Sequence, residues 1–158
     1  MTDNLAFATA TDLAARVRSG DVSARDVVDA ALARIDSTDS ALHAFTYVDA
    51  DGARAEADAI DTARSAGQPL GRLAGVPVGV KDLVAVRSLP MEHGSPLYRG
   101  VIADDDGIAV QRLRADHAVI VGKTATPEFG HLGYTHSQLG PATRNPWSRA
   151  HTPGGSSG

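Results

Sequence analysis

Apolar and polar residues recur with the period of a helix over much of the first 67 positions. The clearest case follows Ser23, a typical N-cap residue, with Asp26 in the capping-box position. Beyond it, apolar residues return every three or four positions, which predicts a helix with one buried face. These residues are Val27, Val28, Ala31, Leu32 and Ile35.

Two further helices are predicted, one on each side of this stretch. Each starts at a threonine or aspartate that can cap a helix and ends close to a glycine. The expected bounds are Thr9 or Thr11 to about Arg18, before Gly20, and Asp49 or Asp51 to about Ala66, before Gly67. Residues 43–48 have strand character. With twelve Asp or Glu against six Arg, residues 1–67 form an acidic helical region in which we find no convincing catalytic motif.

The pattern changes at residue 68, where glycine and proline become frequent and short apolar runs replace the helical period. β-Branched residues alternate in residues 76–81, and residues 117–122 are nearly all apolar, so each run predicts a buried strand. Between them, the acidic run 104–106 is expected to start a helix to about Ala115, because the helix dipole favours negative charge there. Strand, helix and strand in this order predict a parallel βαβ unit and an α/β fold.

Two later stretches show no periodic pattern. Residues 127–150 are predicted to form a long ordered loop, and such loops are often functional. Trp147, the only tryptophan, is expected to anchor it. The stretch 152–158 reads Thr-Pro-Gly-Gly-Ser-Ser-Gly, and its composition fits a flexible linker and an active-site loop about equally well.

Length and composition narrow the class of protein. The 158 residues are enough for one domain, in which residues 1–67 form the helical region and residues 68–158 the start of the sheet and its loops. The chain has no cysteine and no histidines in a metal-binding spacing, so we expect neither a metal nor a cofactor. A net charge of −4 argues against nucleic-acid binding. Without a long apolar run or an apolar leader, we expect a cytoplasmic protein that contacts no membrane.

Lysine is rare in this chain. Of 15 basic residues only Lys81 and Lys123 are lysines, and the rest are arginines. Lysine, unlike arginine, can lose its proton when desolvated and act as a base, so Lys81 at the end of an apolar strand is a candidate catalytic amine. Taken alone, it fits better a structural lysine paired with Asp82 or with a helix end. Lys123 follows Gly122 as in a phosphate-binding loop, but His117 stands where that loop needs glycine. We therefore interpret Lys123 as structural and expect no ATP binding.

Four motifs occur in a specific order. They are Gly-Val-Pro-Val-Gly-Val-Lys-Asp at 75–82, Gly-Lys-Thr-Ala-Thr-Pro-Glu-Phe at 122–129, Thr-Arg-Asn-Pro-Trp at 143–147, and Thr-Pro-Gly-Gly-Ser-Ser-Gly at 152–158. Individually each is weak. Together they resemble the amidase signature family, which includes bacterial amidases and the A subunit of glutamyl-tRNA amidotransferase. The resemblance covers almost the whole chain and implies a mixed sheet flanked by helices.

The resemblance also implies a mechanism. Family members hydrolyse the C–N bond of a carboxylic amide with a Ser–cis-Ser–Lys triad and no cofactor. By motif position, Lys81 is the expected catalytic lysine and Ser156 the bridging serine that follows a cis peptide bond. The segment from Gly130 through His131, Leu132 and Gly133 matches a region that lines the substrate channel. The expected partners are a small-molecule amide and either a second copy of the chain or other subunits.

One departure from the family is large. The nucleophilic serine of the family lies beyond the Gly-Ser-Ser-Gly motif, so this chain resembles an N-terminal fragment, with an incomplete fold that stops at Gly158 and no activity of its own. Ser156 and Ser157 do not occupy the nucleophile's motif position. The alternatives are an inactive truncated product and one half of a split enzyme that needs a partner chain. Smaller departures, at Ala85 and at residues 91–93, affect the expected substrate-side loop.

Overall fold

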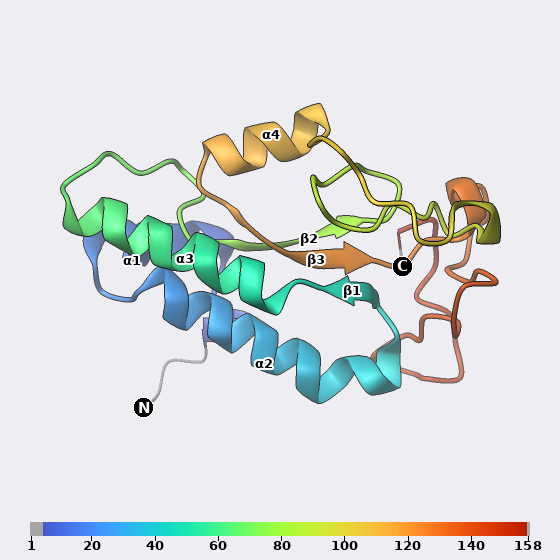
Figure 1. Cartoon of the computed structure of the whole chain (residues 1–158). Coiled ribbons are helices and arrows are strands. Elements are labelled where there is room, and N and C mark those ends of the chain that lie inside the picture. Colours follow the sequence, from blue (N-terminus) through green and yellow to red (C-terminus); the bar gives the residue numbers. More distant parts are fainter. Residues whose placement is uncertain (1–4, 158) are drawn as a thin grey trace. The chain divides into compact units, whose positions relative to one another are not determined.

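The computed structural model describes residues 5–157 (Figure 1). Helices dominate the first half of this range, and short strands separated by long loops dominate the second half. The α-helices are α1 (Ala10–Ser19), α2 (Ala24–Leu42), α3 (Ala50–Ser65) and α4 (Ile108–Ala115), the strands are β1 (Phe45–Val48), β2 (Pro77–Lys81) and β3 (Val119–Thr124), and the 3-10 turns are η1 (Leu5–Phe7), η2 (Pro96–Tyr98) and η3 (Glu128–Gly130).

The three strands form one sheet in the order β1-β3-β2 (Figure 1). β1 and β3 are antiparallel. β2 and β3 run in the same direction, because Val119 N–H donates to the carbonyl of Val76 and Asp82 N–H donates to the carbonyl of Thr124. The sheet is therefore mixed, and β2, α4 and β3 form the predicted βαβ unit. The predicted α/β fold is confirmed.

The chain separates into two compact units. The first contains the described residues up to Asp36, Asp49–Val78 and Gln111–Val121, and the second contains Ser37–Val48, Gly79–Val110 and the described residues from Gly122 onwards. Lys81, Lys123 and Ser156 all belong to the second unit. That the chain is one part of a single domain stays a prediction.

Apolar helix faces form the core of the first unit. α1 contributes Leu13 and Val17, and α2 contributes Val27, Val28 and Leu32, all of them buried. Three members of the face predicted after Ser23 are thus fully buried, while the other two, Ala31 and Ile35, are half-buried. Helical periodicity in the sequence therefore identified the packing face of α2 correctly.

The N-termini of the first three helices lie where the capping residues predicted them. Thr9, Ser23 and Asp49 each accept a hydrogen bond from the backbone N–H three residues later, at 3.2, 2.9 and 3.3 Å. Gly20 follows α1 in the left-handed region with φ of 85°. The side chain of each cap satisfies a backbone donor that the helix leaves unpaired, so these starts are determined locally.

Gly75 shows how closely the chain approaches the helices of this unit just before β2. Its φ is +73°, and a side chain there would meet Cβ of Ala24 at 3.0 Å and the Val17 side chain at 3.1 Å. Glycine at this position therefore lets the chain turn into β2 against the first two helices.

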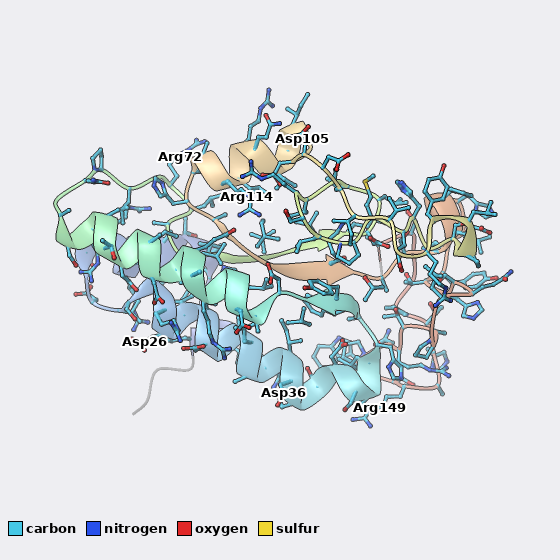
Figure 2. All side chains as sticks on the ribbon, in the orientation of Figure 1. Asp26, Asp36, Arg72, Asp105, Arg114 and Arg149 are labelled. Carbon is cyan, nitrogen blue, oxygen red and sulfur yellow. The ribbon has the colours of Figure 1, made fainter. Side chains whose placement is uncertain are left out.

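Ion pairs cover the polar faces of the same helices. Asp29 on α2 accepts hydrogen bonds from Arg25, one turn earlier, and from Arg54 on α3, each at 2.8 Å. Arg114 on α4, which is labelled in Figure 2, binds the carboxylate of Glu56 on α3. The first of these bridges lies within α2 and the other two join different helices, and in all three the basic residue is an arginine.

Three predictions fail in the later part of the chain. α4 begins at Ile108 and not at the acidic run 104–106, because Asp106 instead accepts a hydrogen bond from Arg87 N–H at 2.7 Å and stays in a loop. β3 ends at Thr124, two residues later than predicted, because its pairing with β1 extends that far. Trp147 does not anchor its loop, since 94% of its surface is exposed.

Within the described residues, no helix is long and apolar enough to cross a membrane.

Candidate active site

Lys81 is the last residue of β2 and lies next to Ser156, 75 positions further along the chain. Its Nζ donates a hydrogen bond to Ser156 Oγ at 2.6 Å. Both residues are half-buried, and the peptide bond between Gly155 and Ser156 is cis. The structure thus brings together the two residues that the family resemblance singles out, with the backbone geometry that it implies.

The Gly-Gly segment before Ser156 packs directly on the backbone of the preceding loop. Thr135, which is buried, donates its hydroxyl proton to the carbonyl of Gly154 at 2.9 Å. A side chain at Gly155 would approach the backbone nitrogen of Tyr134 to 2.7 Å. Only glycine allows two backbones to come so close, so the glycine at position 155 has a packing cause, whereas Gly154 has open space around it and a φ of +101°.

A second buried threonine holds the loop itself. Thr143 donates its hydroxyl proton to the carbonyl of His43 at 2.8 Å, and its N–H donates to the carbonyl of Thr135 at 3.1 Å. A series of hydrogen bonds, two from threonine hydroxyls and one between backbone groups, therefore runs from the turn before β1, through Thr143 and Thr135, to Gly154. The ordered loop predicted over residues 127–150 is built on these contacts and not on Trp147.

Of the four predicted substrate-channel residues, Gly130 lies beside Ser156. Its φ is +70°, and a side chain there would meet Leu83 Cδ1 at 2.6 Å and Ser156 Oγ at 3.5 Å. The ring of His131 is exposed, and its Nδ1 lies 2.7 Å from the carbonyl oxygen of Glu128. Leu132 is half-buried and Gly133 is exposed. A role of these four residues in substrate binding stays a prediction.

Asp82, which follows Lys81, faces the other lysine of the chain. Its Oδ1 lies 3.5 Å from Lys123 Nζ, and the two side chains are 1% and 0% exposed. Lys123 Nζ also donates to the carbonyls of Val84 and Pro90, each at 2.8 Å. The interpretation of Lys123 as structural agrees with this burial, whereas the partner considered for Lys81 in its structural role, Asp82, is engaged by Lys123.

The burial of this pair affects both protonation equilibria. Desolvation raises the pKa of Asp82, and the charge of Lys123 works against that rise. Desolvation likewise lowers the pKa of Lys123, while Asp82 opposes the decrease. The charge of each partner therefore opposes the pKa shift that burial causes in the other. The sequence offered one indication of this pair, the scarcity of lysine, but none that joins residues 41 positions apart.

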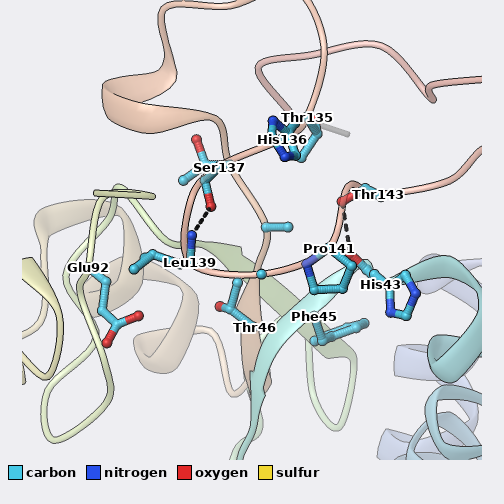
Figure 3. A pocket seen from close by; sticks show the side chains of 13 residues that line it. His43, Phe45, Thr46, Glu92, Thr135, His136, Ser137, Leu139, Pro141 and Thr143 are labelled. Carbon is cyan, nitrogen blue, oxygen red and sulfur yellow. Dashed lines mark hydrogen bonds between the residues drawn. The ribbon is translucent and has the colours of Figure 1, made fainter. Parts of the chain in front are cut away.

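A cavity of about 260 Å³ lies in the same unit (Figure 3). Its walls come from the start of β1, including Phe45 and Thr46, and from the loop 135–143. Glu92 adds a carboxylate, and His43 and His136 each add an imidazole, to a lining that is otherwise apolar or hydroxyl-bearing. Lys81 and Ser156 are not among the lining residues, but the wall includes Thr135, which holds Gly154.

Comparisons with known proteins agree with these features. The A subunit of the glutamyl-tRNA(Gln) amidotransferase of Acidothermus cellulolyticus is 45% identical over 150 residues, covering 95% of this chain and 30% of the relative. A solved chain from a vestigial complex that reveals the origins of an s-triazine catabolic enzyme has a TM-score of 0.91 at 39% identity, covering 95% of this chain and 33% of that one. The peptide amidase of Stenotrophomonas maltophilia has a TM-score of 0.87 at 32% identity, covering 96% and 32%.

This chain therefore spans about a third of the length of the relatives that it matches. The family model for amidases covers residues 26–158, which is most of the sequence. That match includes all four motifs from which the resemblance was inferred. As those motifs predicted, the chain belongs to the amidase family.

Proposed function

We propose that Lys81 and Ser156 are the base and the bridging hydroxyl of a Ser–cis-Ser–Lys triad that hydrolyses a carboxylic amide. The observation that carries this proposal is the distance of 2.6 Å between Lys81 Nζ and Ser156 Oγ. A hydroxyl this close to an amine can pass a proton directly in either direction. Membership of the amidase family supplies the reaction class, cleavage of an amide C–N bond.

The proposed reaction begins with Lys81 in its neutral form. Its amine takes the proton of the Ser156 hydroxyl while Ser156 Oγ takes the proton of the nucleophilic serine. The nucleophilic oxygen forms a bond to the amide carbonyl carbon, and the C–N bond then breaks. The proton returns through Ser156 to the leaving nitrogen, so amine or ammonia departs and an ester of the serine remains. Water hydrolyses this ester by the same relay and releases the carboxylic acid.

The nucleophile in this scheme comes from outside the 158 residues. Ser156 is occupied as the bridge, and Ser157 does not match the nucleophile's position in the family. We therefore propose that the chain by itself does not turn over amides, and that activity needs residues corresponding to the rest of the family's sequence. Those residues would also supply the donors that stabilise the oxyanion.

The names of the relatives support a proposal for substrate and partners. Their names include a subunit of a glutamyl-tRNA(Gln) amidotransferase and a peptide amidase. We propose that the substrate is a small carboxylic amide and that residues 130–133 line its binding site. We also propose that the chain associates with further subunits or with a second copy of itself. A role in supplying aminoacylated tRNA would place the protein in the cytoplasm, where translation uses its product.

Complementation tests this function. The chain is mixed with a polypeptide that starts where the Acidothermus cellulolyticus relative aligns with residue 158, and ammonia release is followed with an amidated dipeptide and with glutamine. We expect turnover by the mixture and none by either part. Lys81→Ala and Ser156→Ala should abolish turnover, whereas the matched control Ser157→Ala, at the adjacent exposed serine, should retain it.

Two results would contradict the proposal. Turnover by the chain alone that disappears in Lys81→Ala would show that the nucleophile lies within these 158 residues. If the mixture still turned over amides after both Lys81→Ala and Ser156→Ala, these two residues would not belong to a catalytic triad. A mixture that binds but never turns over favours the alternative function, an inactive product that retains the family fold.

A further inference from the structure

We propose that Lys123 and Asp82 are positioning residues for Lys81, holding it where its amine meets Ser156. This inference rests on the proposed function, since it explains how the Lys81–Ser156 contact is maintained. Asp82 is the next residue after Lys81, the last residue of β2, and Lys123 belongs to β3. Neither side chain touches Ser156 in the contacts described above, so their effect on Lys81 passes through the backbone.

The Lys123 ammonium lies at the centre of a closed set of acceptors. It has three N–H donors. Two are directed at the carbonyl oxygens of Val84 and Pro90, both at 2.8 Å, and the Asp82 carboxylate lies 3.5 Å away. Carbonyl groups six residues apart are thereby drawn to one cation, which closes the loop that follows Lys81.

Asp82 joins both ends of that loop. Its N–H donates to the carbonyl of Thr124 on β3, at 3.0 Å. Its carboxylate accepts the N–H of Glu92, and its own carbonyl accepts the N–H of His93 at 3.1 Å. The residue next to Lys81 is therefore held at its nitrogen, its side chain and its carbonyl. A change in the Lys123–Asp82 pair must alter the backbone from which the Lys81 side chain projects.

The choice of lysine at position 123 supports this geometry. The chain uses arginine at 13 of its 15 basic positions, including the helix ion pairs described above. Arginine presents a planar fork of donors, whereas an ammonium is compact and can direct its donors at acceptors around it. Buried ion pairs are weak evidence for stability, because apolar replacements are often as stable. The presence of a buried Lys123–Asp82 pair is better explained by its effect on the loop after Lys81, whose carbonyl groups it binds.

Two lysines make this inference directly measurable. Growth with lysine labelled with ¹³C at Cε yields two side-chain signals, which Lys81→Met and Lys123→Met assign. The reference measurement is the shift of the Lys81 signal caused by Ser156→Ala. The same substitution is then made in the double variant Lys123→Met/Asp82→Leu, which leaves no unpaired buried charge and is therefore expected to fold. Circular dichroism checks the fold of each variant.

We expect Ser156→Ala to shift the Lys81 signal in the parent chain and to leave it unchanged in the double variant. An equal shift in both backgrounds would overturn the positioning role while leaving the Lys81–Ser156 contact intact. If Ser156→Ala caused no shift of the Lys81 signal in the parent chain, the Lys81–Ser156 contact itself would be contradicted, and the proposed function with it. If the double variant merely packed less well, its circular dichroism would change too. A variant that keeps the parent's circular dichroism and loses only the response of the Lys81 signal to Ser156→Ala therefore supports the positioning role.

A second measurement needs no variant to fold. The ammonium protons of Lys123, observed with ¹⁵N-labelled lysine in the parent chain at neutral pH, should exchange with water far more slowly than those of free lysine. Slow exchange follows from the two hydrogen bonds to backbone carbonyls, the nearby Asp82 carboxylate and complete burial. Exchange as fast as that of free lysine would mean that the ammonium does not hold the loop, and it would overturn the proposal.

Discussion

The two units of this protein use ion pairs in opposite ways. In the first, arginines bridge helices at the surface, as between Arg25 and Asp58, whose side chains are 39% and 57% exposed. In the second, Lys123 and Asp82 are essentially without contact to water. The exposed bridges connect helices whose own apolar faces already pack together. The buried pair lies at the ends of β2 and β3 and binds backbone groups of the loop that follows β2.

The difference shows that the energy of an ion pair depends on what surrounds it. An exposed pair exchanges hydration for a weak, screened attraction and contributes little. A buried pair is held together because neither charge can be left alone in the interior. The second unit also relies on other buried polar groups, such as Thr135 and Thr143, that bind backbone carbonyls. Hydrogen bonds from buried side chains thus fix the loops of the second unit, whereas packing of apolar faces fixes the helices of the first.

The largest effect is expected from breaking the buried pair. Lys123→Met leaves Asp82 charged and unpaired, so the free energy of unfolding should fall by about 3–5 kcal/mol. The double variant Lys123→Met/Asp82→Leu should recover most of that loss. Urea denaturation followed by circular dichroism measures both. A single variant as stable as the parent would mean that the pair does not differ from the exposed bridges.

A core substitution in the first unit should be nearly as costly. Leu13→Ala removes a buried side chain from α1, and such changes cost about 2–5 kcal/mol because a cavity remains. The matched control is Ala15→Gly on the exposed face of the same helix, which changes backbone propensity but leaves the core filled. If the control were the more damaging of the two, the apolar face would not be what stabilises this unit.

The threonine contacts of the second unit should follow. Thr143→Val preserves shape but leaves the carbonyl of His43 without its donor, a loss of about 1–3 kcal/mol. Thr152→Val, at an exposed threonine of the same loop region, serves as the control and should be close to neutral. Equal effects at both threonines would contradict the view that buried hydroxyls hold the loop.

The smallest effect concerns the exposed bridges and disappears in acid. Hydrogen bonds from Arg54 and then Arg25 lower the pKa of Asp29 in the folded protein. A lowered carboxyl pKa contributes stability above the pKa of the unfolded chain, about 3.9, and that contribution disappears as pH falls through the folded value. Asp29→Asn should therefore lower the free energy of unfolding slightly at neutral pH, and the difference from the parent chain should disappear as the pH falls below the folded pKa of Asp29. A large loss at pH 7 would show that this exposed network is not marginal.

Much of the first unit followed from local patterns. The caps at Thr9, Ser23 and Asp49 and the apolar periodicity of α2 identified helix starts and a packing face, because both signals involve residues within one or two turns. The βαβ order also followed from the alternation of apolar runs. Membership of the amidase family followed from four short motifs in sequence order.

Tertiary contacts decided the rest. The start of α4 moved because Asp106 binds Arg87 N–H and Gly107 N–H binds the carbonyl of Ala85, contacts that no helix signal within 104–115 encodes. Trp147 was expected to anchor its loop, but it is exposed and the loop is held by threonine hydroxyls instead.

The site divides in the same way. The sequence by itself determined which residues have the chemistry for a site, two lysines among arginines and a Gly-Gly-Ser-Ser motif. That Lys81 lies beside Ser156 and Asp82 beside Lys123 was decided by the folded chain, because these partners are 75 and 41 positions apart. Local sequence encodes capping and periodicity, whereas proximity between distant residues arises only when the strands and loops that carry them pack together.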